Sequence, residues 1–400
     1  MDYKRLLTKV EKTLESIELD GNSGTSGTMV QQIAEIIATN FRDELGISGG
    51  RIYEARGDDS FELIGRFGIA REARLGISVP RGYKPIELVL ENGIVVMSPD
   101  DPGVDPVLEE QLGASRFAAI AAGDEEYIVS FDVADRLGRE DILFSLNLIR
   151  YVINDRMRAM RYESLIVEAQ RIQASILPQR VPVYAGFDIW GKTVPAEIVS
   201  GDFYDFIPVN ENILGLAIAD GSGHGLPAAL VVRDIYMGLR MATDRDFKII
   251  RTMQKLNRII HRSRMTTKFV SLFYGELETG GIFIYTNAGH NAPFLLKGNK
   301  IEYLKNGGPV LGPTPDATYT RGFVNLEPGD LMCLYSDGVV EAHDAHDREF
   351  GLERLQRVVR NNRERTAQEI GQEVLARVAK WGRAREDDRT VVIVKALANG

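Results

Sequence analysis

The sequence is poor in cysteine, in long apolar runs and in positive charge, and each shortage excludes a class of protein. Cys333 is the only cysteine among 400 residues, so an internal disulfide and a zinc site built from several cysteines are excluded. No apolar run approaches the roughly 18 to 20 residues of a membrane span, and the first residues lack the apolar stretch of a secretory signal. The 57 acidic and 48 basic residues give a net charge of -9, which argues against nucleic-acid binding. We therefore expect a soluble, cytoplasmic protein without nucleic-acid or membrane partners.

The order of helical and strand patterns divides the chain into four parts. Apolar spacing predicts a helix over Tyr3–Leu19, a flexible break over Asp20–Thr28 and a second helix over Met29–Leu45. Strand-like pieces follow up to about Phe131, which indicates a small α+β domain. The predicted parts are an N-terminal helix and break (1–27), the α+β domain (28–139), a helical linker (140–177) and a C-terminal domain (178–400).

The linker is predicted to be one long helix over Glu140–Ile176, which ends before Pro178. Its apolar residues recur at alternating steps of three and four, as in the seam of a helical pair: Ile142, Leu146, Ile149, Ile153, Met157 and Met160. The seam then slips in phase and resumes at Leu165, Ala169, Ile172 and Ile176. We interpret this helix as a dimerising linker, and the alternative is a helix packed on its own domain.

The C-terminal part alternates predicted strands with two separate pairs of helices. The helices are expected at 228–242 and 247–264, and again near 352–359 and 366–379. Strands occupy most of the chain between and around these pairs, from Phe187 to Lys395. This order predicts an α/β fold class in which packed sheets are flanked by helices.

Four acidic sites adjoin predicted strands in this domain: Asp202, Asp220, Asp337 and the pair Asp387-Asp388. A single aspartate at a strand end is usually a turn residue, but four beside apolar strands favour a cluster. An all-oxygen cluster suits Mg²⁺ or Mn²⁺, and cations would offset the mutual repulsion of the carboxylates. Two such ions would also activate a bridging water. At Gly221 the missing β-carbon would let a backbone carbonyl approach a metal.

The histidines and the cysteine are weaker candidates for chemistry. His343 and His346 are expected in a solvated loop rather than at a metal. His224 lies in the glycine loop GSGHG, where it would donate a proton or, as we favour, hold the loop. We interpret His290 as a turn or packing residue, and Cys333, inside an apolar strand, as a core residue rather than a nucleophile.

Taken together, these residues resemble the bacterial PPM-type serine phosphatases of the SpoIIE and RsbU kind. The matching strings follow one another over about Glu168–Ala396: AQRIQASILP, IVSGDFYD, ADGSGHGLPAAL, TNAGHNAPFLL, GGPVLG, YSDGVVEA with EFGLERL, and EDDRTVVIV. The resemblance implies a β-sandwich with helices outside, in α-β-β-α layers, and two bound Mn²⁺ or Mg²⁺ ions. The α+β domain resembles a GAF sensor domain by its pattern alone.

Carried over position by position, the resemblance assigns the metal ligands. Asp202 would bridge both ions, Asp220 and the Gly221 carbonyl would hold one, and Asp337 and Asp387 would hold the other, with Asp202 and Asp220 as the catalytic pair. A metal-activated hydroxide would attack phosphorus directly, without a phosphoenzyme. The family often has a second glycine before the bridging aspartate and a valine after the second aspartate. Here serine and glycine stand at these two places, and neither change removes a ligand.

The resemblance also implies a partner and a pathway. Substrates of the family carry phosphoserine or phosphothreonine on STAS-type anti-sigma-factor antagonists, within partner-switching stress or developmental pathways. We expect a small-molecule or protein signal to act on the GAF-like domain and to reach the phosphatase domain through the linker of a homodimer. Two alternatives stay open: a ligand-sensing scaffold with weak or no phosphatase activity, and a hydrolase of small phosphoesters.

Overall fold

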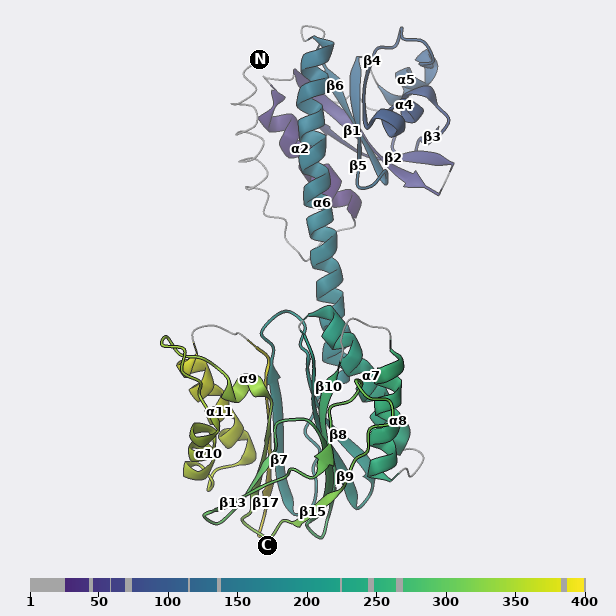
Figure 1. Ribbon diagram of the computed structural model, residues 1–400. Helices are drawn as coiled ribbons and strands as arrows, with labels where there is room; N and C mark the ends of the chain where they lie inside the picture. Colours follow the sequence, from purple (N-terminus) through teal and green to yellow (C-terminus); the bar gives the residue numbers. More distant parts are fainter. Residues whose placement is uncertain are drawn as a thin grey trace. The chain divides into compact units, whose positions relative to one another are not determined.

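The computed structural model describes residues 26–42, 46–57, 59–68, 74–113, 116–134, 138–223, 225–243, 248–263, 269–382 and 387–398. The chain divides into two compact units, Met1–Glu163 and Ser164–Gly400, and the long helix α6 (Arg139–Ile176) runs from the first into the second (Figure 1). The helix predicted over Tyr3–Leu19 lies outside the described residues. The next helix begins at Ser26, inside the segment predicted as a flexible break. Because the boundary between the units falls within the predicted linker, the four-part division stays a prediction.

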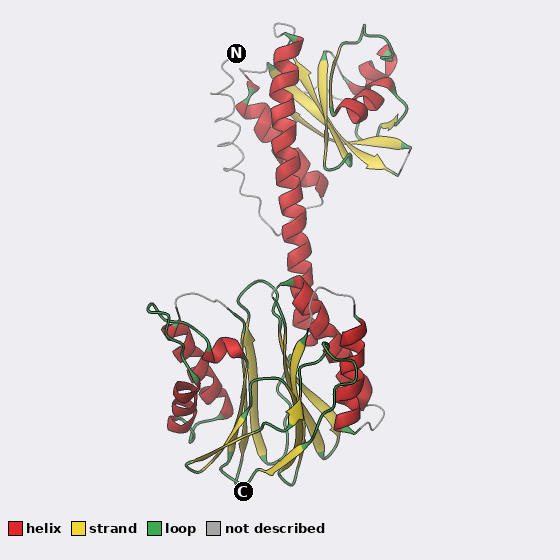
Figure 2. Ribbon diagram, in the orientation of Figure 1, coloured by secondary structure: helices red, strands yellow, loops and turns green. Residues whose placement is uncertain are grey.

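The N-terminal unit is built on one antiparallel sheet with the strand order β3-β2-β1-β6-β5-β4. Alternate residues of a strand face opposite sides, so Ile52 and its neighbour Tyr53 enter two different apolar cores. One core is closed by α2 and α6 and the other by α4 and α5 (Figure 2). The elements are α2 (Ser26–Asn40), β1 (Ile47–Arg56), β2 (Ser60–Gly68), β3 (Ser78–Pro80), α4 (Lys84–Asn92), β4 (Ile94–Met97), α5 (Pro106–Leu112), β5 (Phe117–Ala122) and β6 (Tyr127–Val133).

The first part of α6 belongs to the core of the N-terminal unit. Met160 is half-buried, but the other five residues that predicted a seam for a second helix are instead buried against this unit's own sheet and α2: Ile142, Leu146, Ile149, Ile153 and Met157. The prediction that they form a dimer seam is therefore wrong, and the alternative of a helix packed on its own domain is correct for this stretch. The spacing is the same in both cases because either surface covers one stripe of the helix.

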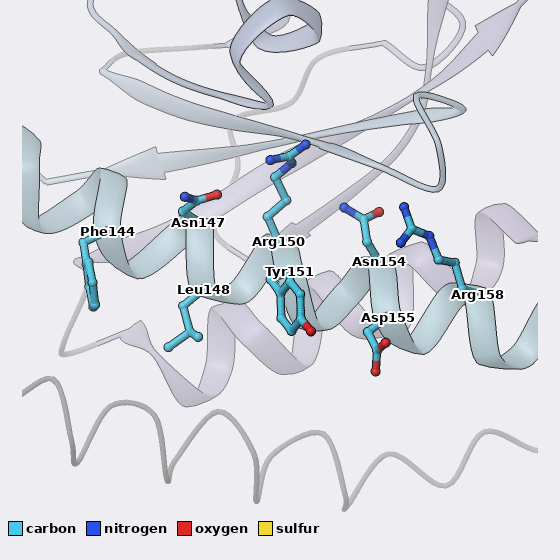
Figure 3. A pocket seen from close by; sticks show the side chains of 8 residues that line it. All are labelled: Phe144, Asn147, Leu148, Arg150, Tyr151, Asn154, Asp155 and Arg158. Atoms are coloured by element: carbon cyan, nitrogen blue, oxygen red, sulfur yellow. The ribbon is translucent and has the colours of Figure 1, made fainter.

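A second stripe of α6 is exposed at most of its positions, with Leu148 half-buried against the core. Phe144, Leu148, Tyr151 and Asp155 project together from one side of the helix and line a surface pocket (Figure 3). On another side, Arg150 projects toward the sheet and donates to the Ala121 carbonyl. The exposed stripe has the same three- and four-residue steps and continues in phase into the second predicted seam, from Leu165 onward. The phase slip in the sequence thus marks two faces of one helix.

The C-terminal unit contains two sheets. The first has the order β14-β11-β10-β9-β8, with β15 beside β11, and the second has the order β13-β12-β16-β17-β7. Its strands are β7 (Phe187–Val194), β8 (Asp202–Asn210), β9 (Ile213–Gly221), β10 (Val270–Glu278), β11 (Ile282–Ala288), β12 (Phe294–Lys297), β13 (Lys300–Tyr303), β14 (Gly307–Gly308), β15 (Gly322–Asn325), β16 (Leu331–Tyr335) and β17 (Arg389–Ala396). Its helices after α6 are α7 (Leu226–Thr243), α8 (Ile249–Arg262), α9 (Asp337–Val340), α10 (Leu352–Asn361) and α11 (Ala367–Trp381).

Three apolar cores separate the layers of this unit. One lies between α7, α8 and the first sheet, one between the two sheets, and one between the second sheet and α9, α10 and α11. Figure 2 shows the sheets face to face with helices outside both. The predicted α-β-β-α layering is confirmed. None of the helices that the structure describes combines the length and apolar character that crossing a membrane requires.

Candidate functional site

The first sheet contributes two aspartates to one end of the sandwich. Asp202 begins β8, and Asp220 lies near the end of β9. The two strands are antiparallel, and these residues are direct partners in the register. Directly opposed side chains lie on the same face of a sheet. The hairpin therefore brings both carboxylates to a single edge.

The second sheet contributes the other acids. Asp337 begins α9 two residues after β16 ends at Tyr335, and Asp387 precedes β17 by two residues. The two strands are antiparallel neighbours in which Tyr335 pairs with Val391. The two acids therefore follow and precede adjacent strand ends at the same edge of their sheet.

Hydrogen bonds join the two edges. Thr390, in β17, donates its hydroxyl to Oδ2 of Asp202 over 2.6 Å. Asp388 accepts from Gly201 N over 2.6 Å with one oxygen and from Ala196 N over 2.7 Å with the other. Asp388 is buried, and both of its carboxylate oxygens accept hydrogen bonds from backbone N–H groups. Asp387 is exposed, so of these two acids it is the one that a ligand can reach.

Two glycines allow the chain segments to meet this closely. A β-carbon on Gly338 would lie 2.1 Å from the Asp388 carbonyl oxygen, and one on Gly201 would lie 3.1 Å from the Gly221 carbonyl oxygen. A β-carbon on Gly221 would be 3.4 Å from the Ala228 carbonyl oxygen, an ordinary contact. The protein's own atoms therefore leave room for a β-carbon at position 221 but not at Gly338, and the expected role of Gly221 beside a metal stays a prediction.

The cluster is short of positive charge. Burial, and then the nearby Asp220, raise the pKa of Asp202 well above its ordinary value, against hydrogen bonds from Ser336 and Thr390. Burial raises the pKa of Asp220 to about 7, and the charges of Asp337 and Asp387 add to this. Burial also raises the pKa of Asp337. The negative charges of carboxylates at the second sheet thus raise the pKa of a carboxylate of the first sheet.

The donor set fits hydrated divalent cations. Within the described residues, no three His, Cys, Asp or Glu side chains form a ready-made metal cage. Mg²⁺ is commonly held by one or two carboxylates and keeps several waters, so it needs no such cage. All of the donors at this edge are oxygens, and a cation would offset both the burial and the carboxylate repulsion that raise the pKa of Asp220. Asp202, Asp220, Asp337, Asp387 and the Gly221 carbonyl would hold the ions.

Helix α6 contacts the segment that leads into this site. Gln173 is buried, accepts from Ser200 N over 2.8 Å and donates to the Ser200 carbonyl. The Ser200 hydroxyl in turn accepts from Asp202 N over 3.0 Å. Both residues lie in the C-terminal unit. One side chain of α6 thus fixes the backbone two residues before Asp202.

A buried histidine lies behind Asp220. Ser271 is the register partner of Asp220 in β10, and its hydroxyl is 2.7 Å from Nδ1 of His290. The backbone N–H of His290 donates to the Asn287 side chain over 2.8 Å. His290 is buried, and burial lowers its pKa to about 4, so it is neutral at physiological pH. The interpretation of His290 as a packing residue is confirmed.

The remaining candidates lie outside the cluster. The His346 side chain is 78% exposed, and its loop is fixed by Asp344, which accepts from His346 N and Arg348 N. Cys333 is fully buried in β16, and burial raises the pKa of its thiol, so it is a core residue as expected. His224 lies outside the described residues, so its role stays a prediction.

The sequence did not reveal the roles of four residues at the site: Gln173, Ser336, Thr390 and Asp388, which binds backbone N–H groups. Each lies inside a string that carries the resemblance, such as AQRIQASILP and EDDRTVVIV. Their roles depend on partners 27 to 188 positions away in the chain. Membership of a string was therefore the only signal available in the sequence.

Three comparisons relate the chain to known proteins. Residues 210–397 match the family model of stage II sporulation protein E (SpoIIE). The phosphoserine phosphatase RsbU of Bacillus subtilis is 30% identical over 273 residues, covering 64% of this chain and 80% of that protein. The phosphoserine phosphatase RsbP of the same bacterium is 23% identical over 149 residues, covering 36% of this chain and 37% of that protein. The SiaA-PP2C domain of Pseudomonas aeruginosa has the same fold, with a TM-score of 0.53 and 20% identity over 60% of this chain and 98% of that chain.

Replacing Gln173 with alanine should weaken both the fold and the site. The change leaves the buried Ser200 N–H and carbonyl without partners, at a cost of about 1–3 kcal/mol. We expect a lower melting temperature and a lower kcat/KM for an aryl phosphate, because Ser200 leads into Asp202. The matched control is Gln170→Ala, one turn earlier on an exposed face. Equal activity of the two variants would show that the contact does not position the site.

Acid should destabilise the protein partly through His290. Its pKa is about 4 in the fold and ordinarily 6.5, so the unfolded chain binds this proton first. The contribution to stability is complete above pH 6.5 and declines as the pH falls toward 4, by about 2 kcal/mol at pH 5. Urea unfolding of wild type and His290→Gln at pH 7.5, 6 and 5 tests this. We expect a shallower decline in the variant, and parallel declines would contradict the assignment.

Proposed function

The chain belongs to the RsbU-type serine phosphatases with a SpoIIE-type catalytic domain, and from this premise we propose that it dephosphorylates a protein carrying phosphoserine or phosphothreonine. The substrate class is a STAS-type anti-sigma-factor antagonist, which places the enzyme in a partner-switching pathway. The observation that carries the proposal is the convergence of aspartates from two sheets on one edge, joined through Thr390 and Asp388.

We assign the ligands as the family pattern implies. Asp202, Asp220, Asp337, Asp387 and the Gly221 carbonyl would hold two Mn²⁺ or Mg²⁺ ions, with Asp202 shared between them. Bound ions of this kind neutralise phosphoryl charge and activate water near neutral pH. The chain's own part is positioning: Thr390 fixes one oxygen of Asp202, and Asp388 fixes the Gly201 backbone before it.

The metal assignment predicts manganese-dependent turnover that requires Asp220. We expect wild-type protein to hydrolyse an aryl phosphate or a phosphoserine protein as Mn²⁺ is titrated in. Asp220→Asn should lower kcat/KM by about a hundredfold or more, since metal stabilisation of the transition state is worth several kcal/mol. Glu302→Gln, an exposed acid in β13, should leave turnover unchanged. Metal-independent turnover, or full activity of Asp220→Asn, would refute the assignment.

We further propose that the N-terminal unit is a GAF-like sensor that acts on the phosphatase through α6. A small-molecule or protein signal would alter the docking of α6, and Gln173 would transmit the change to Ser200 and Asp202. Two observations support this route. The helix is part of the N-terminal core through residues such as Ile149, and it also hydrogen-bonds the segment before the catalytic aspartate.

We propose that the exposed stripe of α6 pairs with the same stripe of a second copy. Phe144 is 52% exposed and Tyr151 is 71% exposed, although both are large and apolar in character. Steps of three and four residues suit a parallel helical pair. Asp155 and Arg158 occupy consecutive positions of the stripe, and polar residues at such core positions set the register of a helical pair at a cost in stability.

A charge placed in this stripe should separate the two copies. We expect wild-type protein to sediment as a dimer and Leu165→Lys to weaken association by a hundredfold or more, because each copy would lose a buried leucine worth about 1.5–3 kcal/mol. The control Glu163→Lys also adds a lysine to α6, but off the stripe, and should leave the dimer intact. Sedimentation analysis over a range of concentrations measures both. A monomeric wild type, or a fully dimeric Leu165→Lys, would contradict the pairing.

A further inference from the structure

Positive charge is concentrated in one short segment of this acidic protein. Residues 248–268 contain seven of the 48 basic residues and none of the 57 acidic ones. The rest of the chain therefore has a net charge of -16, against -9 for the whole. Most of the segment forms α8, and the metal cluster contains none of it.

The cations of α8 share its outer face. The buried face of the helix is formed by Ile249, Thr252, Met253, Leu256, Asn257 and Ile260, which pack toward the first sheet. Arg251, Lys255, Arg258 and Arg262 recur at steps of four, three and four on the other side. Arg258 and Arg262 are exposed, and within the described part of the chain neither has a hydrogen bond or an ion pair. Their charge is therefore available to a partner.

The C-terminal end of this face lies at the catalytic end of the sheet. His261 Nδ1, in the last turn of α8, is 2.7 Å from the Gly312 carbonyl oxygen. Leu311, next to Gly312, exchanges two hydrogen bonds of 2.8 and 3.0 Å with Val270. Val270 is the register partner of Gly221, whose carbonyl is an assigned metal ligand. A continuous set of contacts thus connects the last turn of α8 to the metal site.

We propose that the outer face of α8 is the docking surface for the phosphoprotein substrate, and that it recognises an acidic region beside the phosphorylated residue. The proposal rests on the proposed function, which supplies the substrate. The docking proposal adds two points to that function. It names a surface outside the metal site that the substrate contacts, and it states that the substrate is negatively charged there.

A protein fits this surface better than a bare polyanion does. Ile259 is 46% exposed between the two arginines, one residue from Arg258 and three from Arg262. An apolar side chain among cations matches a protein surface in which a hydrophobic contact is surrounded by carboxylates. Arginine forks also bind carboxylates in a bidentate manner, which gives orientation as well as attraction.

Two phosphoserine peptides test the docking surface. Each has about 20 residues with a central phosphoserine, enough to extend about 60 Å. Their flanks are rich in Asp and Glu in one and in Asn and Gln in the other. We expect wild-type protein with Mn²⁺ at low ionic strength to show a kcat/KM about tenfold higher for the acidic peptide. The preference should shrink as salt is added. The double variant Arg258→Glu/Arg262→Glu should lose it while hydrolysing p-nitrophenyl phosphate at the wild-type rate.

The control reverses the same number of charges elsewhere. Arg357→Glu/Arg360→Glu changes two exposed arginines of α10, in the helical layer on the other sheet, and should keep the preference. Equal turnover of both peptides by wild type, or equal losses in the two double variants, would overturn the docking surface. A third outcome would also overturn it: anionic phosphatidylglycerol vesicles bind wild type but not the α8 variant, and the variant keeps the preference for the acidic peptide. The face would then bind a membrane.

Failure of the proposed function gives a different result. Wild-type protein that hydrolyses neither p-nitrophenyl phosphate nor either peptide with Mn²⁺ would contradict the phosphatase assignment. The docking surface is then measured by fluorescence anisotropy of the labelled peptides. Tighter binding of the acidic peptide, weakened about tenfold by Arg258→Glu/Arg262→Glu, supports the surface, and equal binding of both peptides overturns it.

Discussion

The catalytic unit depends on holding mutually repelling carboxylates from two sheets at one edge. Left to itself, such an edge would open, because burial and like charge both favour protonation or separation. The fold counters this with hydrogen bonds that cross between the sheets. Asp388 anchors the backbone before Asp202, and Thr390 holds the carboxylate of Asp202 itself. The apolar core between the sheets sets the separation over which these bonds can form.

The strand that carries Asp202 is held from both of its faces. On one face it meets the second sheet. On the other, Arg240 of α7 makes a bidentate ion pair with Asp205, with distances of 2.9 and 3.1 Å, and lies over the ring of Tyr236. The Asp205 side chain is only 2% exposed, so its charge needs this partner. Because α7 begins at Leu226, soon after Gly221, the same ion pair also joins this helix to the strand of Asp202.

The sequence was informative where structure is local and silent where it depends on distant partners. Apolar runs located the strands, and the acids at their ends indicated a cluster because antiparallel hairpins bring such ends together. The spacing in α6 predicted one seam with a phase slip, but it could not tell a surface packed on the helix's own unit from a surface for a second helix, because both require the same periodicity. The hydrogen bond from Gly201 to Asp388 joins residues 187 positions apart, and the one from Ser200 to Gln173 joins residues 27 positions apart. No local pattern encodes such contacts.

Two sources of positive charge would serve two different roles in this protein: bound metal ions at the carboxylates, and arginines on the outer face of α8. Burial raises the pKa of Asp220 and the charges of Asp337 and Asp387 add to this, so cations in contact with these carboxylates would favour their charged forms. Exposed arginines on α8 cannot supply this, since solvent and salt screen their charge beyond about 8–10 Å. Bound ions would meet the need of the chemistry, while the arginines remain free for recognition at the surface. An acidic protein could in this way dephosphorylate an acidic partner. The arginines of one helix would attract the partner, and the reaction would take place at one edge of the sandwich.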